Sequence, residues 1–290
     1  MLNRKIDFAI IIRVNNANPN GDPLNGNRPR TNYDGYGEMS DVCLKRKIRN
    51  RLLDDGEAIL VQSDDYCIDG YHSIKERYDN NKEISDAKDD YEKQRQIACK
   101  TWYDVRAFGQ VLAFKKNKKN KKSDKNTDTD NDETDSDSVS IGIRGPVSIQ
   151  NAFSKEVVDV ESLQITKSVN LETNKNNPLM KNSDTMGMKH RVNSGIYVSS
   201  GSINRQLAEK TGFSDEDAEK LKKALCKMFD NDESSARPAG SMEVIKVIWW
   251  THEGVTLSSA KVHRSLVVAP DGTYSLEKLE GIATQELDGQ

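Results

Sequence analysis

The chain has 290 residues, of which 35% are hydrophobic and 31% are charged, and its formal net charge is −3. A chain of this length can bury a substantial core, as one elaborated domain or as two small ones. The near-neutral balance excludes a protein that binds nucleic acid through bulk positive charge, so any such surface must be local.

The spacing of cysteines and histidines argues against a metal centre. The four cysteines are far apart without a CxxC pair, and the four histidines form no HExxH or HxH pair. We therefore expect a reduced cytoplasmic protein with no zinc site and no cofactor. The apolar run Phe8–Ile12 is too short for a signal peptide, and no other stretch has the length of a membrane span.

The first fifty residues predict a strand, a loop and a helix. Ile6–Val14 is β-branched and apolar, which is typical of a buried strand. The segment 15–39 is dense in Asn, Gly and Pro and predicts a loop. Ser40 can cap a helix over Asp41–Leu53. An apolar stripe at four-residue spacing marks the core side of this helix: Leu44, Ile48 and Leu52.

The next section mixes short elements. It predicts a strand near Ile59–Val61 and helices over Lys82–Lys100 and Tyr103–Phe114. The following Lys115–Ser138 contains no apolar residue, starts lysine-rich and ends acidic. This composition predicts a disordered surface insertion.

The second half of the chain is richer in strands. Gly145–Phe153, Val157–Val169 and Arg191–Ser200 read as strands, and Asn170–Lys189 is a polar excursion between the last two.

Two helices and two strands complete the chain. The predicted helices cover Ile203–Thr211 and Asp215–Phe229, the second capped by Ser214. Met242–Trp250 is a long apolar strand, and the tail predicts a further strand over Val262–Ala269.

Without its insertions the chain has the order β-α-β-β-α-β, an α+β pattern found in the ferredoxin-like or RRM arrangement. Two insertions decorate it: Gly56–Ser140 after the first helix and Ser154–Lys189 between the middle strands. The order is also compatible with other α+β folds.

The basic residues of the first helix are the main candidates for binding. Lys45 and Arg49 flank one edge of the apolar stripe, Lys47 and Arg51 flank the other, and Arg46 points away. Lys45 and Arg49 are about 6 Å apart along the helix axis. That spacing resembles the distance between successive phosphates on an extended strand. The alternative is a solvated face whose long side chains cover apolar surface.

The loop before this helix adds amides and charge. Asn18 and Asn20 offer amide donors, and Arg28 and Arg30 place charge beside the helix start, a combination that suits phosphate and sugar contact. The alternative is an ordinary turn cluster. Asp22 is a candidate ligand for a divalent ion, but no second carboxylate is placed to help.

Two later segments are further candidates. The excursion Asn170–Lys189 carries apolar residues at 178–180 and 186–188. Such a tip fits a wedge between bases, a docking surface on a neighbouring subunit or a mobile loop. Arg237 lies in a turn before the last core strand, where the backbone can approach a ligand closely. Three residues with basic side chains follow the excursion or end it: Lys189, His190 and Arg191.

Six stretches of the chain carry a family signature. They are AIIIRVNNANPNGDP, DVCLKRKIRN, DVRAFGQVLAF, RGPVSIQNAFS, TMGMKHRVNSGIYV and SARPAGSMEV. In this order they resemble the CRISPR-associated backbone subunit of type I Cascade complexes, most closely the type I-C form. The match covers nearly the whole chain apart from Lys115–Ser138, which departs from the family pattern, and the tail.

The resemblance implies an RRM-like palm from residues 1–55, 141–153 and 190–290. It also implies a helical finger domain from 56–140 and a thumb from 154–189. Copies of the chain would polymerise along one CRISPR RNA as a helical filament. They would hold its backbone and leave base edges free to pair with a target DNA strand. Other Cascade subunits and a recruited helicase-nuclease are further implied partners, and no membrane is involved.

The resemblance also implies roles for individual residues. Guide phosphates would face Lys45, Arg46 and Arg49, whereas Lys47 and Arg51 are expected to be only surface residues. Further contacts to the guide are implied for Arg28, Arg30, Lys189, His190, Arg191 and Arg237.

No nucleophile or phosphate-binding motif is present in the sequence, so we expect no enzymatic activity. Two alternatives stay open. One is an RNA-cleaving backbone subunit of the type III kind, for which Asp184 is the candidate aspartate. The other is a general single-stranded RNA-binding protein.

Overall fold

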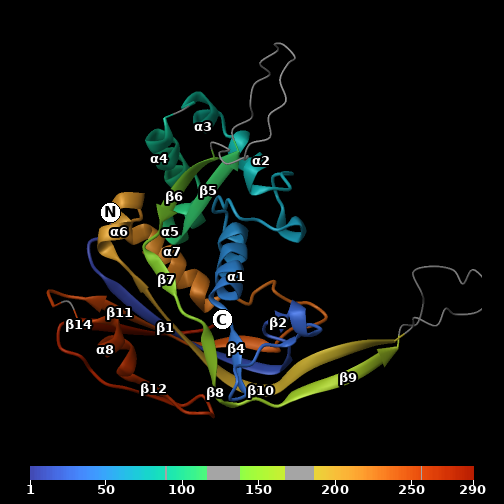
Figure 1. Cartoon of the computed structure of the whole chain (residues 1–290). Helices are drawn as coiled ribbons and strands as arrows, with labels where there is room; N and C mark the ends of the chain where they lie inside the picture. Colours follow the sequence, from blue (N-terminus) through green and yellow to red (C-terminus); the bar gives the residue numbers. More distant parts are fainter. Residues whose placement is uncertain (89, 116–137, 167–185, 256) are drawn as a thin grey trace, which may run out of the picture.

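A central antiparallel sheet organises the computed structural model, which describes residues 1–88, 90–115, 138–166, 186–255 and 257–290 (Figure 1). Its strands follow the order β14-β11-β1-β10-β8-β4, and β7 and β9 also pair with β10. The strands are β1 (Ile6–Ala17), β4 (Tyr36–Met39), β7 (Val147–Ile149), β8 (Ala152–Val157), β9 (Val160–Thr166), β10 (Met186–Ile203), β11 (Met242–His252) and β14 (Ile282–Asp288).

The central strand β1 is buried on both faces, which explains its continuous apolar sequence. Phe8 and Ile10 face one side of the sheet and belong to the main core, whereas Ala9 and Ile11 face the other side. The predicted strand Ile6–Val14 is therefore confirmed, and pairing with β10 extends it to Ala17.

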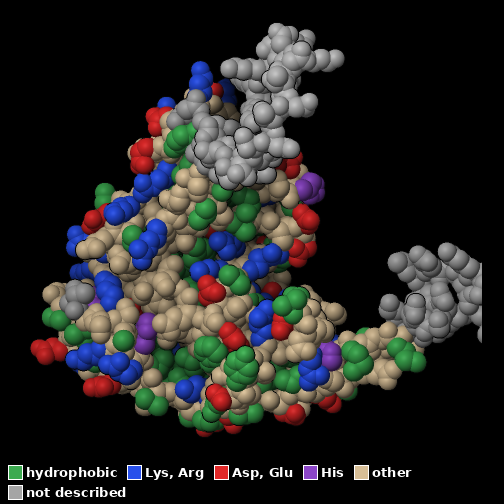
Figure 2. All heavy atoms as spheres, in the orientation of Figure 1, with side chains coloured by type: hydrophobic (Ala, Val, Ile, Leu, Met, Phe, Trp, Pro, Cys, Tyr) green, Lys and Arg blue, Asp and Glu red, His purple; other side chains and the backbone are tan. Residues whose placement is uncertain are grey.

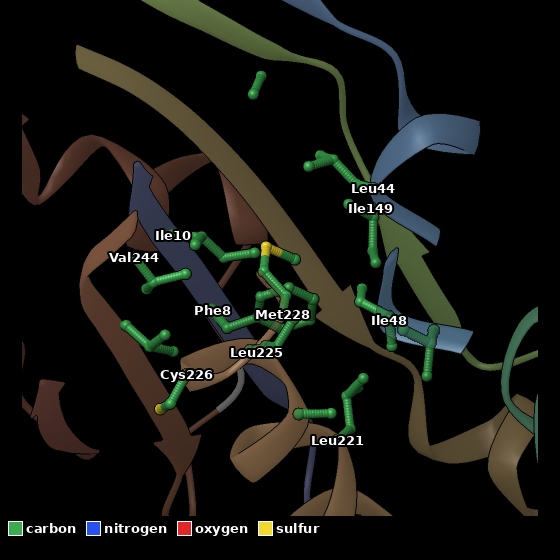
Figure 3. Packing of buried hydrophobic residues seen from close by; sticks show 14 of the residues in the cluster. Phe8, Ile10, Leu44, Ile48, Ile149, Leu221, Leu225, Cys226, Met228 and Val244 are labelled. Atoms are coloured by element: carbon green, nitrogen blue, oxygen red, sulfur yellow. The ribbon is translucent and has the colours of Figure 1, made fainter. Parts of the chain in front are cut away.

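Two helices cover one face of the sheet, α1 (Asp41–Asp54) and α7 (Asp215–Cys226). Side chains from both helices and from β1 converge on one core (Figure 3). The Phe8 ring stacks on Trp249 of β11 at 5.7 Å between centroids. The predicted stripe of α1 is confirmed, because all three of its residues are buried: Leu44, Ile48 and Leu52.

Both helix starts have the expected caps. The Ser40 hydroxyl accepts a hydrogen bond from the Cys43 N–H at 3.3 Å. Ser214 and Asp217 form a reciprocal capping box at the start of α7. The chain order strand, helix, strand, strand, helix, strand is thus found for β1, α1, β7 with β8, β10, α7 and β11.

The C-terminal segment covers the opposite face of the sheet with α8 (Ser259–Arg264), β12 (Leu266–Val268) and β13 (Tyr274–Leu276). The predicted strand Val262–Ala269 is wrong in its first half, since Val262 lies in α8. Ser258 caps this helix by accepting from the Lys261 N–H, and Val262 packs with Trp250 on the sheet. Tertiary packing here overrides the strand preference of a β-branched residue.

The first insertion has a core of its own, formed around Tyr78, Trp102, Val105 and Leu112. A short helix, α6 (Arg205–Thr211), lies beside it after β10. The elements of the insertion are η2 (Asp64–Tyr66), α2 (Ile74–Asp79), α3 (Lys82–Asp86), α4 (Tyr91–Thr101), α5 (Tyr103–Phe108), β5 (Gly109–Lys115) and β6 (Ser138–Arg144).

Two predicted helices of this insertion are corrected. Lys82–Lys100 is interrupted, because Lys88 has a positive φ of 49° and Asp90 caps a new helix, α4. Tyr103–Phe114 ends early, at Phe108. Gly109 has φ 79°, and a Cβ there would come within 2.3 Å of the Ile143 carbonyl oxygen. The chain therefore turns at this glycine into a strand paired with β6.

The second insertion begins as a two-stranded arm. β9 pairs with the first part of β10, from Met186 opposite Thr166 to Val192 opposite Val160. This arm projects away from the body at the lower right of Figure 1. The predicted strand Val157–Val169 is therefore divided between β8 and β9, and Arg191–Ser200 is the middle of a longer strand.

Several predicted features lie outside the described residues. They are the interior of the Lys/Asp-rich insertion (116–137), the apolar residues 178–180 and Asp184. Within the described ranges, none of the helices has the length and hydropathy that a bilayer span requires.

Candidate nucleic-acid interface

The basic residues of α1 point in three directions around the helix. Figure 2 shows Lys and Arg side chains over α1, between the helical part above and the strand arm below. Lys45 and Arg49 lie on the edge that faces α5, Lys47 lies on the edge that faces the 230–240 loop, and Arg46 lies on the outer side.

Lys45 forms a weak ion pair within the protein. Its Nζ lies 2.9 Å from Asp41 Oδ2, one turn earlier on the helix, and both side chains are partly open to solvent. Such surface pairs contribute little free energy, so a phosphate can replace the aspartate as the partner of Lys45.

Arg46 is the most exposed cation of the helix, at 41% side-chain exposure. Its Nη2 lies 3.1 Å from Asp65 Oδ1 in η2 and also contacts Ser63, the residue before η2. The Ser63 hydroxyl, by donating to Asp65, lowers the pKa of that carboxyl, and Arg46 adds to this effect. Arg46 therefore lies in an exposed acidic contact that an incoming phosphate can displace.

Arg49 has a structural partner. Its Nε lies 2.9 Å from Asp104 Oδ2, its side chain is 13% exposed, and the aspartate is buried. The guanidinium also lies over the Phe108 ring at 5.1 Å. The Asp104 carboxylate accepts from the N–H groups of Leu60 and Val61 as well. The strand predicted over Ile59–Val61 is absent, because the aspartate takes those donors in place of a neighbouring strand.

Lys47 is buried, so its expected place on the surface is wrong. It forms an ion pair with Asp232, and the same carboxylate oxygen accepts from Arg237 Nε at 2.8 Å. Burial lowers the pKa of Lys47, and Asp232 opposes that shift. Arg51 is also mostly covered and binds Asp55 at 2.7 Å. The predicted site residue Arg237 is thereby joined to α1 through Asp232.

The two amides of the preceding loop hold the loop itself. Asn20 Oδ1 accepts from the Ser40 N–H and from the Ser40 hydroxyl, both at 2.9 Å. Asn18 is buried, and its Nδ2 donates to the Asn27 carbonyl at 2.7 Å. Both residues therefore position the loop on the start of α1.

The charged residues of this loop are more open. Arg30 is 39% exposed and lies 3.5 Å from Asp22, whose carboxylate also accepts from the Leu24 N–H. Arg30 therefore remains available to an anion, and Asp22 has a local structural role. Among the residues that the structure describes, no three His, Cys, Asp or Glu side chains are grouped to hold a metal.

The loop and the arm meet at a serine that the sequence did not single out. Ser162 Oγ on β9 lies 3.0 Å from Arg28 Nη1 and 2.9 Å from His190 Nδ1 on β10. Next to them, Arg191 donates twice to Glu161, at 2.9 and 2.7 Å, and Lys189 is half-buried on the same strand. The structure thus brings Arg28 and His190 together at the root of the arm.

The chain matches proteins of known family. A family model described as CRISPR-associated protein Cas7 matches residues 4–285. A relative from Haloferax volcanii, described as CRISPR-associated protein Cas7, is 29% identical over 244 residues, which are 82% of this chain and 68% of the relative.

Two solved structures resemble the chain more distantly. One is a chain of a "CRISPR RNA-guided surveillance complex, pre-nicking", with 15% identity, a TM-score of 0.47 and coverage of 89% of this chain and 81% of that one. The other is a chain of a "CRISPR RNA-guided surveillance complex", with 17% identity, a TM-score of 0.41 and coverage of 93% and 77%.

Proposed function

Because this chain belongs to the Cas7 family of CRISPR-associated proteins, we propose that it is a non-catalytic backbone subunit of a type I-C Cascade surveillance complex. In this role it holds the phosphate backbone of CRISPR RNA and presents guide segments for pairing with target DNA. The family match extends from residue 4 to residue 285, so nearly the whole chain supports the proposal.

One observation carries the RNA contact: three cations of α1 and its loop have partly exposed or local acidic partners. Arg46 and Arg30 are 41% and 39% exposed, and among the described residues Lys45 pairs only with Asp41, on its own helix. Exchange of these aspartates for RNA phosphates releases counterions and makes binding depend strongly on salt. Contacts of this kind carry no base specificity, as a guide of variable sequence requires.

The proposed parts of the molecule follow its layers. The central sheet with α1 and α7 forms the RRM-like palm, and the insertion with α2–α5 forms the finger domain. The β9–β10 arm begins the thumb. The arm exposes Ile165, Met186 and Met188, and apolar side chains at this position suit contact with a second copy of the chain.

Arg49 acquires a double role in this proposal. It holds α1 against α5 through Asp104, and it lies one turn from Lys45, where a phosphate on the helix could also reach it. Its direct contact with a phosphate remains a prediction. The same holds for Asn18, Asn20, Arg237 and the basic residues of the arm root.

Purification from cells that express a CRISPR array and the other Cascade subunits tests the assembly. We expect the chain to elute in high-mass particles with one discrete RNA. Recovery of RNA-free monomers from those cells would exclude the proposal. A control culture without the array should yield no discrete RNA.

A cleavage assay tests the non-catalytic part. Assembled particles are incubated with complementary RNA and with complementary DNA in the presence of magnesium, and we expect no cuts by this subunit. Regularly spaced cuts that disappear in Asp184→Ala would instead identify an RNA-cleaving subunit.

A further inference from the structure

We propose that a pocket between α4, α5 and α6 is a second nucleic-acid site, which binds phosphodiesters of a strand at a place separate from the α1 surface. The pocket has a volume of about 390 Å³. It lies where the first insertion meets the helix that follows β10. Its lining includes Gln96, Cys99, Lys100, Arg106, Lys210 and Thr211.

The described residues that line this pocket carry positive charges and no negative charge. Among the residues that the structure describes, no acidic side chain lines it. Lys100 and Lys210 are both exposed, and neither side chain has an ion pair or hydrogen bond among the described residues. Arg106 is different, since its Nη2 lies 2.8 Å from Asp217 and 3.8 Å from Glu57. The two lysines therefore supply the surplus charge, and the arginine, held by its acidic partners, is part of the lining.

The two lysines have a local stabilising role too. Each lies in the last turn of its helix, where cations interact favourably with the free carbonyls. This stabilising role would be filled wherever the two helix ends lay. It does not explain why both lysines line the same pocket. The contacts of α4 with α5 and α6 bring the two helix ends together. Figure 2 shows Lys and Arg side chains on the flank where α4 and α6 lie.

A second cavity in the described part of the protein gives a useful contrast. Its volume is about 700 Å³, and its lining includes three Lys or Arg residues: Arg4, Lys5 and Arg205. Each of them has an acidic partner: Glu253 at 2.8 Å, Asp7 at 3.2 Å and Glu209 at 3.2 Å, respectively. The charges of the larger cavity are thus balanced locally, whereas the smaller pocket has no acidic lining residue within the described ranges.

The type of cation favours a strand over a small free anion. A site for a single phosphate ion usually offers several fixed donors, such as a bidentate arginine or a row of backbone N–H groups. Here the surplus charges belong to exposed lysines, which are flexible point charges on long stems. Such side chains suit the backbone of a passing strand, where they fix position and tolerate any sequence.

Binding of a fluorescent 20-nucleotide single strand to the full chain tests the site, by anisotropy at several salt concentrations. We expect Lys100→Ala combined with Lys210→Ala to raise Kd roughly tenfold. The slope of log affinity against log salt should fall by about 1.4, for two lost phosphate contacts. Lys223→Ala with Lys261→Ala is the matched control, because it removes two exposed lysines elsewhere and should change binding little.

The same titration separates this site from the α1 surface. Lys45→Ala with Arg46→Ala is measured alone and together with the pocket variant, and we expect the two losses to add. If only the α1 variant weakens binding, or if the pocket variant equals its control, the pocket proposal is overturned. Protection of the pocket by inorganic phosphate alone, with strand affinity unchanged, would overturn it as well.

Discussion

Arg49 of α1 and Asp104 of α5 form an ion pair of 2.9 Å that joins the helix of the proposed RNA surface to the inserted helical domain. The aspartate is buried and also accepts two backbone N–H groups from the segment after α1. This pair therefore fixes three parts of the chain relative to one another: α1, α5 and the Leu60–Val61 segment.

Loss of the arginine should destabilise the protein. Arg49→Ala leaves Asp104 buried without its countercharge, and we expect the free energy of unfolding to fall by roughly 2–4 kcal/mol. Arg205→Ala is the control, since Arg205 pairs with the neighbouring Glu209 in an exposed i,i+4 contact and should cost under about 1 kcal/mol. Urea unfolding of both variants measures the difference. Equal stability of the two would show that the Arg49–Asp104 pair is not structural.

RNA affinity should respond to the two weakly paired cations. We expect Lys45→Ala with Arg46→Ala to weaken binding of a single-stranded RNA and to lower its salt slope by about 1.4. The urea midpoint should stay almost unchanged, because both side chains are partly exposed. Lys45→Ala with Arg49→Ala is the poorer test, since it also breaks the pair with Asp104. Unchanged affinity of the Lys45/Arg46 variant at every salt concentration would refute the assignment.

Asn20 should act as an acceptor within the protein. Its Oδ1 receives two hydrogen bonds from Ser40, so Asn20→Ala leaves the Ser40 N–H without that partner and should cost about 1–2 kcal/mol. Asn20→Asp keeps an oxygen at this position and should remain close to the unchanged protein in stability. Asn25→Ala, in an exposed part of the same loop, is the control. An equal loss of unfolding free energy in Asn20→Ala and Asn20→Asp would contradict the role of Asn20 as a hydrogen-bond acceptor.

Acid stability should depend on Asp69. The Arg77 guanidinium donates to this carboxylate, and the pKa of Asp69 is lowered to about 2 from 3.8. A depressed pKa means that the unfolded state binds the proton first. The pair therefore stabilises the fold fully above pH 3.8, and this contribution disappears as the pH falls through about 2.

Asp69→Asn removes that dependence. We expect the variant to be less stable at neutral pH and to lose less stability between pH 4 and pH 2 than the unchanged protein. Denaturant unfolding at several pH values measures both curves, and Asp34→Asn serves as a control on an exposed turn. If the free energy of unfolding falls in parallel with pH in Asp69→Asn and in the unchanged protein, the stabilising role of the Asp69–Arg77 pair is contradicted.

The sheet and its two covering helices could be predicted because periodicity in the sequence reports burial. The stripe of Leu44 and Ile48 and the cap at Ser214 are local patterns, and both are confirmed. Short elements were harder to predict, because a single residue can determine the type or the end of such an element. Gly109 ends a helix through its positive φ, and Val262 joins a helix because it packs on Trp250.

The partners of the basic residues could not be predicted. Asp104 is 55 positions from Arg49, and Asp232 is 185 positions from Lys47. Helical spacing gave the direction of each lysine and arginine, but not which acid the fold would bring to it. The sequence therefore predicted α1 correctly as a basic helix. It could not show which of the lysines and arginines on this helix are exposed and which are buried.

Native mass spectrometry of the purified chain with RNAs of increasing length tests the central claim most directly. We expect the number of bound copies to rise in regular steps with RNA length, at an affinity that depends on salt and is indifferent to base sequence. A single copy on every RNA, or binding that requires one particular base sequence, would contradict the proposed backbone subunit.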